Sequence, residues 1–134
     1  MKDNNIRRWE PIQKIDAELY LDSIEDKEDG LIISLSAGVG EPSLIIDFGY
    51  SVLSYQSTTE ICVLKTLDDF PILSTRWQLF ITEESDYINW LVKQSYKVVE
   101  SEKKRHYIIK HGDGLIHVIA SLEPSVKWKS TSNV

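Results

Sequence analysis

The stretch RHYIIKHGDGLIHV at residues 105–118 constrains the fold most, because it places a turn signal between two alternating apolar segments. A Gly-Asp-Gly sequence in this position is typical of a β-hairpin. A two-residue loop at Gly112-Asp113 or at Asp113-Gly114 gives the same assignment of faces. One face of the predicted hairpin then carries only apolar or aromatic side chains, namely Tyr107, Ile109, Ile116, Val118 and Ala120. We therefore predict an antiparallel hairpin with one face in the core.

Similar patterns recur along the chain and predict further strands. Alternation from Ala17 to Asp22 indicates a half-buried strand, and the charged run EDKEDG at 25–30 separates it from the apolar segment LIISLSAG. These two segments predict a second hairpin. Further strands are expected in SLIIDFG (43–49), YSVLSYQSTTE (50–60) and WQLFIT (77–82). A short or edge strand followed by a turn is expected within 61–76, and another strand at 95–101.

One segment has helical spacing. In SDYINWLVKQS (85–95), Ser85 is suited to cap a helix, and Asp86 places a negative charge in the first turn, where the helix dipole favours it. Apolar residues from Tyr87 to Val92 then fall on one side. We predict a single α+β domain over residues 1–134, with a mainly antiparallel sheet of roughly six or seven strands and one packed helix. Residues 1–10 and 125–134 are expected to be loose ends.

The net charge and the single cysteine limit the classes of function and the cellular compartment that the sequence favours. The chain has 15 Lys and Arg residues against 21 Asp and Glu residues, a formal net charge of −6. This balance disfavours direct binding to a nucleic-acid backbone. The lone Cys62 cannot form an internal disulfide, which is typical of a reducing compartment, and its apolar neighbours predict that it is buried. No signal-peptide pattern and no long uncharged apolar run are visible, so we expect a cytoplasmic protein without membrane attachment.

The acidic residues gather in two places. Five of them, Asp22, Glu25, Asp26, Glu28 and Asp29, surround the predicted turn at 25–30 and are interrupted only by Lys27. A second group consists of Glu83, Glu84 and Asp86. Such groups are commonly just solvated surface, but an anionic patch can also steer and orient a cationic partner. Trp90 and Trp128 are candidate aromatic anchors for an interface, although a buried Trp90 is equally consistent with the pattern.

The three histidines, His106, His111 and His117, raise the alternative of a metal or catalytic site. Zinc needs three or four ligands, and no CxxC, HxxxH or HExxH spacing supplies the others. With a two-residue loop, His106 and His117 share the face opposite the core without facing each other directly, and His111 lies beside the turn. A three-residue loop would instead bring His111 and His117 diagonally close. We expect solvent-facing or rim histidines, no cofactor and no enzymatic activity.

The order of the segments also carries a resemblance. The resemblance is carried by the strand AELYLDS, the following hairpin, WQLFITEESDYINWL and HYIIKHGDGLIHVIAS, with the signatures S-D-Y-x-x-W and H-Y-x-I. The chain resembles a group of small bacterial proteins that includes immunity proteins of toxin–immunity systems. The resemblance implies a protein that binds a cognate protein toxin in the cytosol and blocks its active site or substrate groove. With the acidic charge and the missing catalytic motifs, it predicts a non-enzymatic inhibitor, which we expect to be a monomer or a homodimer. Two alternatives remain: a metal- or ligand-binding domain using His106, His111 or His117, and an assembly module exposing Trp90 or Trp128.

Overall fold

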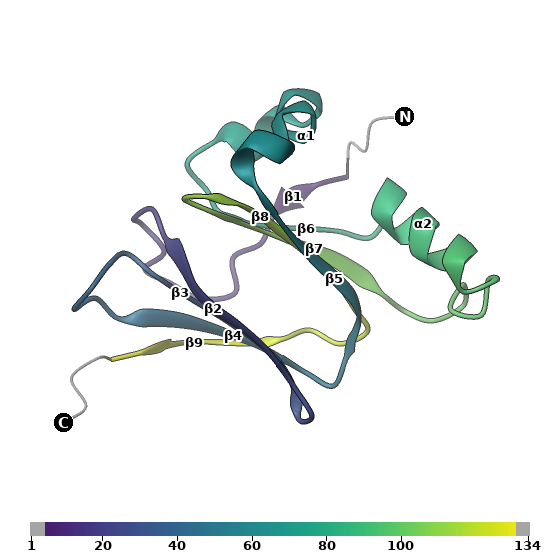
Figure 1. Ribbon diagram of the computed structural model, residues 1–134, viewed down its shortest axis with the longest axis horizontal. Helices are drawn as coiled ribbons and strands as arrows, with labels where there is room; N and C mark the ends of the chain where they lie inside the picture. The colour runs from purple at the N-terminus through teal and green to yellow at the C-terminus, as the bar shows by residue number, and fades with distance from the viewer. Residues whose placement is uncertain (1–4, 131–134) are drawn as a thin grey trace.

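The computed structural model describes residues 5–130, and within them nine strands form two antiparallel sheets (Figure 1). The five-stranded sheet has the order β1 (Arg7–Arg8), β6 (Leu79–Thr82), β7 (Arg105–His111), β8 (Gly114–Ala120) and β5 (Val52–Thr59). The four-stranded sheet has the order β2 (Tyr20–Lys27), β3 (Gly30–Ser36), β4 (Ser43–Gly49) and β9 (Ser125–Lys129). The helices are α1 (Leu64–Asp69) and α2 (Asp86–Gln94), with 3-10 turns at Glu60–Cys62 and Pro71–Ser74.

The main core lies between the two sheets. Because side chains alternate along a strand, each sheet directs every second residue inward. The four-stranded sheet contributes Leu31, Ile33, Leu35, Leu44, Ile46 and Phe48, and the five-stranded sheet contributes Leu79, Ile81, Tyr107, Ile109, Ile116, Val118 and Ala120. Tyr107 sits at the centre, with edge-to-face contacts to Trp9 and Phe48 at centroid distances of 5.0 and 5.3 Å. Such rings bury large apolar areas, which stabilises the sandwich.

A second, smaller core lies on the outer face of the five-stranded sheet. Phe80, Ile108 and Leu115 pack there against Val63 and Leu73, which come from the segment around α1. The helix α2 lies over the same sheet beside β7 (Figure 1). The strands β7 and β8 are therefore covered on both faces, and this explains why nearly all of their residues are buried. A charged substitution on either face of these two strands would lie in a core.

Several predictions from the sequence are confirmed. The domain is α+β, the central hairpin pairs His111 with Gly114 through a Gly112-Asp113 loop, and the predicted inward residues lie in the main core. A Cβ atom on Gly114 would lie 2.1 Å from the Thr58 carbonyl oxygen, so β8 approaches β5 closely because this residue is glycine. The helix α2 begins after Ser85, whose side chain accepts a hydrogen bond from the Ile88 N–H.

Other predictions are wrong. The segment 61–76 forms α1 and 3-10 turns instead of a strand, and residues 95–101 form turns. Cys62 is exposed. The chain ends are not uniformly loose, since β1 pairs with β6, Trp9 is buried and β9 pairs with β4; residues 1–4 and 131–134 lie outside the described part. The nine strands form two sheets instead of one sheet of six or seven strands, because the chain crosses between the layers after β1, after β4 and after β8. None of the helices within residues 5–130 has the length and apolar character needed to cross a bilayer.

Candidate functional site

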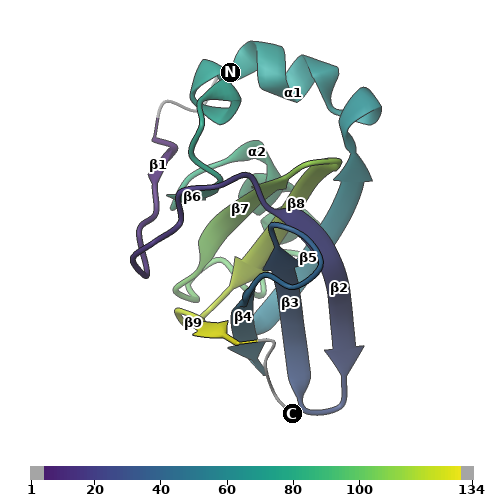
Figure 2. The same cartoon turned by 90° about the vertical axis from the view of Figure 1, so that its left-hand side faces the viewer.

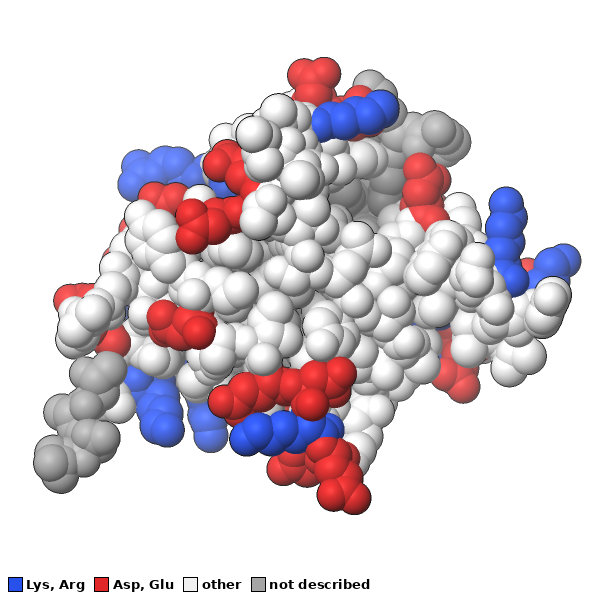
Figure 3. Space-filling view, in the orientation of Figure 1, with Lys and Arg blue, Asp and Glu red and all other residues white. Residues whose placement is uncertain are grey.

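The hairpin formed by β2 and β3 carries five exposed acidic side chains. They are Asp22, Glu25, Asp26, Glu28 and Asp29. The strand β2 extends to Lys27, so Glu25 and Asp26 belong to the strand, and only Glu28 and Asp29 form the turn. Figure 3 shows acidic side chains gathered around a basic one at the lower edge, where this hairpin ends in Figure 1. We call these five residues the acidic hairpin.

Most of this negative charge has no cationic partner within the described chain. Glu25 forms an ion pair with Lys27 at 3.3 Å, between two exposed side chains, and such a pair contributes little to stability. Asp26 lies near Tyr55 on β5, whose pKa is raised first by burial and then by the charge of Asp26. No ion pair is found for the other three acids among residues 5–130. The acidic hairpin therefore projects a negative field into solvent.

The second acidic group, Glu83, Glu84 and Asp86, is engaged within the domain. Glu83 accepts two hydrogen bonds from Arg7, at 2.8 and 2.9 Å, and lies 3.7 Å from Arg105. The hydrogen bond from Arg7 is the main reason why the pKa of Glu83 is lowered. Glu84 accepts a hydrogen bond from the Asn5 side chain, and Asp86 lies in the first turn of α2. These acids belong to the other sheet and the start of α2, so they do not extend the acidic hairpin.

The two candidate aromatic anchors differ in exposure. Trp90 on α2 is 49% exposed and stacks on Tyr87 at a centroid distance of 5.8 Å. Trp128 on β9 packs against the main core, and its indole N–H donates to the Gln13 carbonyl oxygen at 2.9 Å. Trp128 therefore holds the segment before β2 onto the sheet. Of the two, Trp90 has the more accessible ring.

Two histidines meet beneath α2. The Nε2 atom of His106 lies 2.8 Å from the Nδ1 atom of His117, and the Nδ1 atom of His106 lies 2.8 Å from the Ser85 hydroxyl. Both rings also contact Tyr87, whose hydroxyl is 2.6 Å from that of Ser54. As predicted, His106 and His117 share the outer face without facing each other directly. The prediction that they face solvent is wrong, since α2 covers them and His106 is only 4% exposed.

The environment of this histidine pair keeps both rings neutral. Burial lowers the pKa of His106 to about 3, with a smaller contribution from His117, and burial lowers the pKa of His117 to about 4. A charged imidazole would lose its hydration there without gaining an opposite charge. General bases work best with a pKa near the working pH, so these rings are poorly matched to proton transfer at neutral pH. The chain Ser85–His106–His117 instead links α2 to the sheet.

We predict that replacing Ser85 with alanine destabilises the fold by about 1 to 2 kcal/mol. The substitution removes the acceptor for the Ile88 N–H, at 3.2 Å, and the hydroxyl partner of the His106 ring. Chemical denaturation monitored by tryptophan fluorescence measures the effect. Ser101→Ala, at an exposed turn position, is the matched control and should change the free energy of unfolding by a few tenths of a kcal/mol. Equal losses in the two variants would contradict the proposed linkage.

His111 lies apart from the pair. Its Nδ1 atom accepts a hydrogen bond from the Asp113 N–H at 3.2 Å, and its buried Nε2 atom has no hydrogen-bond partner in the protein. Within residues 5–130, no group of three or more His, Cys, Asp or Glu side chains is arranged to hold a metal ion. The two-residue loop thus separates His111 from His106 and His117, as the sequence analysis expected for that loop length.

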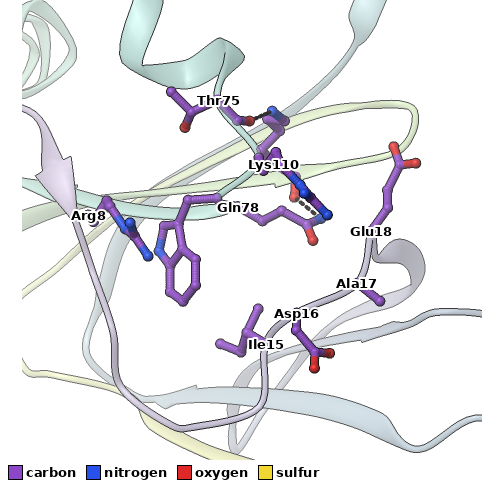
Figure 4. A pocket seen from close by; sticks show the side chains of 10 residues that line it. Arg8, Ile15, Asp16, Ala17, Glu18, Thr75, Gln78 and Lys110 are labelled. Carbon is purple, nitrogen blue, oxygen red and sulfur yellow. Dashed lines mark hydrogen bonds between the residues drawn. The ribbon is translucent and has the colours of Figure 1, made fainter.

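A pocket of about 600 Å³ lies between the segment before β2 and the edge of the five-stranded sheet (Figure 4). Arg8, Arg76 and Lys110 line it together with Asp16 and Glu18. The Arg8 guanidinium lies 4.2 Å from the centroid of the Trp77 ring, and the Lys110 ammonium donates to the Thr75 carbonyl oxygen. Two of the three cationic side chains in the pocket, Arg8 and Lys110, thus already have partners within the chain. The three cations and two carboxylates that line the pocket nearly balance in charge.

The floor of this pocket is formed by Gln78, which sequence analysis did not single out. Its Oε1 atom accepts from the Leu19 N–H at 3.1 Å, and its Nε2 atom donates to the carbonyl oxygens of Lys110 at 3.0 Å and Leu19 at 3.4 Å. The side chain is 3% exposed. The Gln78 side chain therefore supplies hydrogen bonds to backbone groups where the segment before β2 meets the five-stranded sheet, in place of the bonds that a neighbouring strand would make. A single glutamine beside Trp77 carries no local signal for this role.

Comparisons with known proteins do not assign the chain to a group. No protein-family model, no curated protein and no solved structure matches it.

Proposed function

We propose that this protein is an immunity-type inhibitor that binds a cognate bacterial protein toxin through the acidic hairpin and neutralises it without catalysis. The observation that carries the proposal is the exposure of five acidic side chains on one hairpin, most of them without a cationic partner in the described chain. A basic surface on the toxin, such as the substrate groove of a nuclease, is complementary to this charge. Such a complex forms in the cytoplasm, with the inhibitor as a monomer or homodimer.

The rigidity of the hairpin supports this proposal. Its strands are paired from Tyr20 to Lys27, and β3 is in turn paired with β4, so Asp22, Glu25 and Asp26 are held on a sheet, while Glu28 and Asp29 lie in the tight turn that joins its strands. Their positions are thus ordered before binding, which lowers the conformational entropy lost on association. By contrast, Glu83 is already neutralised by two arginines and has less charge to offer.

Neutralising three hairpin acids is expected to slow toxin association. In the variant Asp22→Asn, Glu28→Gln, Asp29→Asn, the formal net charge changes from −6 to −3, and no ion pair of the described chain is lost. We expect the association rate constant at low salt to fall about ten-fold, with a smaller change in the dissociation rate constant. Surface plasmon resonance with the product of the adjacent reading frame measures both constants.

The matched control neutralises the same number of acidic side chains at sites outside the acidic hairpin. Asp68→Asn, Glu100→Gln, Glu102→Gln also raises the net charge by three units, at exposed sites outside the acidic hairpin. This variant should retain an association rate within about two-fold of the parent protein. Equal slowing in both variants, or association that is insensitive to salt, would contradict steering by the hairpin. Failure of the two proteins to form a complex would contradict the proposed function itself.

A further inference from the structure

The strand β5 differs from the other edge strands of the described sheets. It pairs with β8 on one side only and ends the five-stranded sheet. The opposite edge, β1, is only two residues long, and the edges β2 and β9 of the other sheet carry charged residues. The eight residues of β5, VLSYQSTT, contain no charge and no proline. Edge strands of monomeric proteins are commonly protected by charged residues, proline or bulges; β5 has no charge and no proline, and its one register shift lies between Val52 and Ser54, before Tyr55.

The register shows which backbone groups of β5 point away from the sheet. The Glu60 N–H donates to the Asp113 carbonyl oxygen at 2.8 Å, and β5 continues from there in register against β8. Hydrogen-bonded and non-hydrogen-bonded pairs alternate in an antiparallel ladder, so Thr58 and Gln56 bond to β8. The N–H and C=O groups of Tyr55, Ser57 and Thr59 therefore point outward, at a side of the strand where Ser57 and Thr59 are exposed.

The open edge lies next to the acidic hairpin. Figure 2 shows β5 and β2 at the same side of the molecule, and Asp26 on β2 is near enough to Tyr55 on β5 for its charge to help raise the pKa of that phenol. Figure 3 shows a mainly uncharged surface above the acidic side chains of the hairpin. A strand added along β5 would thus lie beside Asp26 and next to the hairpin that carries the other four acids, and lysine or arginine side chains on that strand would complement this charge.

We propose that β5 takes up an extended, lysine- and arginine-rich segment of the partner protein as an additional strand. Backbone hydrogen bonds to Tyr55, Ser57 and Thr59 supply a ladder, and the acidic hairpin selects a basic segment. The inference rests on the proposed function and specifies how the partner docks. A second copy of this chain is a poorer occupant, because it would bring another acidic hairpin toward the first at a net charge of −6 for each molecule.

A peptide probe tests the proposal without the toxin. An eight-residue peptide of alternating lysine and threonine should bind and shift the amide NMR resonances of Tyr55, Ser57 and Thr59. Ser57→Pro removes an outward N–H group without removing a hydrogen bond to β8, and proline is tolerated at such edge positions. We expect this variant to bind the peptide about ten-fold more weakly. Ser57→Thr keeps the N–H group and should bind as the parent protein does.

The outcomes separate this proposal from the function on which it rests. Thermal unfolding first establishes that both Ser57 variants are folded, and a glutamate–threonine peptide should not bind. Equal peptide binding by Ser57→Pro, or no binding by the lysine peptide at millimolar concentration, overturns the strand-addition proposal. Dimerisation through β5 that Ser57→Pro abolishes also overturns it, in favour of a second copy. In each of these cases the acidic hairpin remains testable through the toxin association rates.

Discussion

Lowering the pH from about 7 to about 5 should reduce the free energy of unfolding by several kcal/mol, because His106 and His117 resist protonation in the fold. Their pKa values are about 3 and about 4 in the folded protein, against an ordinary value of 6.5. Below about 6.5 the unfolded chain binds protons that the folded protein does not. Stability is therefore complete above that pH and declines as the pH falls, until the folded rings are protonated near pH 3 to 4.

The size of the effect follows from the shifts. One pH unit within this window costs about 1.4 kcal/mol for each histidine that stays neutral in the fold and is charged when unfolded. Two such residues give a loss of roughly 2 to 4 kcal/mol at about pH 5, which is large compared with the usual stability of a domain. His111, whose pKa is also lowered by burial, adds to the effect with the same sign.

Urea denaturation between pH 7 and pH 5 measures this loss, and imidazole NMR shifts report the protonation directly. In the variant His117→Gln, an amide takes the place of one ring of the pair, so stability should decline less steeply over this range. His111→Asn keeps an acceptor near the Asp113 N–H and serves as a comparison outside the pair. The prediction fails if the parent protein and His117→Gln lose stability in parallel, or if the His106 ring titrates near pH 6.

Gln78→Met should destabilise the protein by about 3 kcal/mol, the largest effect that we expect from a single uncharged substitution. Methionine has a similar length, but it cannot pair with the Leu19 N–H or the Lys110 carbonyl oxygen, which Gln78 bonds at 3.1 and 3.0 Å. These backbone groups would remain buried without partners, and each such group costs about 1 to 3 kcal/mol. Thermal and urea unfolding measure the loss.

Gln94→Met is the matched control, since Gln94 is exposed at the end of α2. Its free energy of unfolding should stay within about 0.5 kcal/mol of the parent value. In Gln78→Met we also expect faster amide hydrogen exchange at Leu19, because the hydrogen bond that protects this N–H group is lost. A small effect at position 78, or unchanged exchange at Leu19, would show that Gln78 does not hold the two sheets together.

The parts of the fold that were predicted correctly depend on local chemistry. The turn at Gly112-Asp113, the alternation through Tyr107 and Ile116, and the N-cap at Ser85 are each encoded within a few residues. Within 61–76 the sequence predicts a short or edge strand followed by a turn, because Ile61, Cys62, Val63 and Leu64 are apolar and adjacent. In the structure only Val63 of these packs into the small core with Phe80 and Ile108, whereas Ile61 and Leu64 are exposed, and this tertiary packing outweighs the local β preference.

The candidate site was predicted only in part. The sequence identified the acids of the β2–β3 hairpin, because a charged run between two apolar strands has to lie at the surface. It also proposed Glu83 as a partner-binding residue, since nothing near Glu83 in the sequence reveals that Arg7, 76 residues away, is its partner. The open edge of β5 was also missed, because strand order in a sheet is a property of the whole chain.

The sequence by itself determined that this chain forms antiparallel hairpins, one capped helix and an acidic surface loop, because side-chain period, turn residues and charge act over short distances. The tertiary structure decided how those elements are used. It divided the strands between two sheets, left β5 at an edge beside the acidic hairpin, and buried His106 against His117 beneath α2. These features depend on which distant segments of the chain pack against one another. That packing buries the two histidines, which lowers their pKa values, and it leaves the outward backbone groups of β5 without a neighbouring strand.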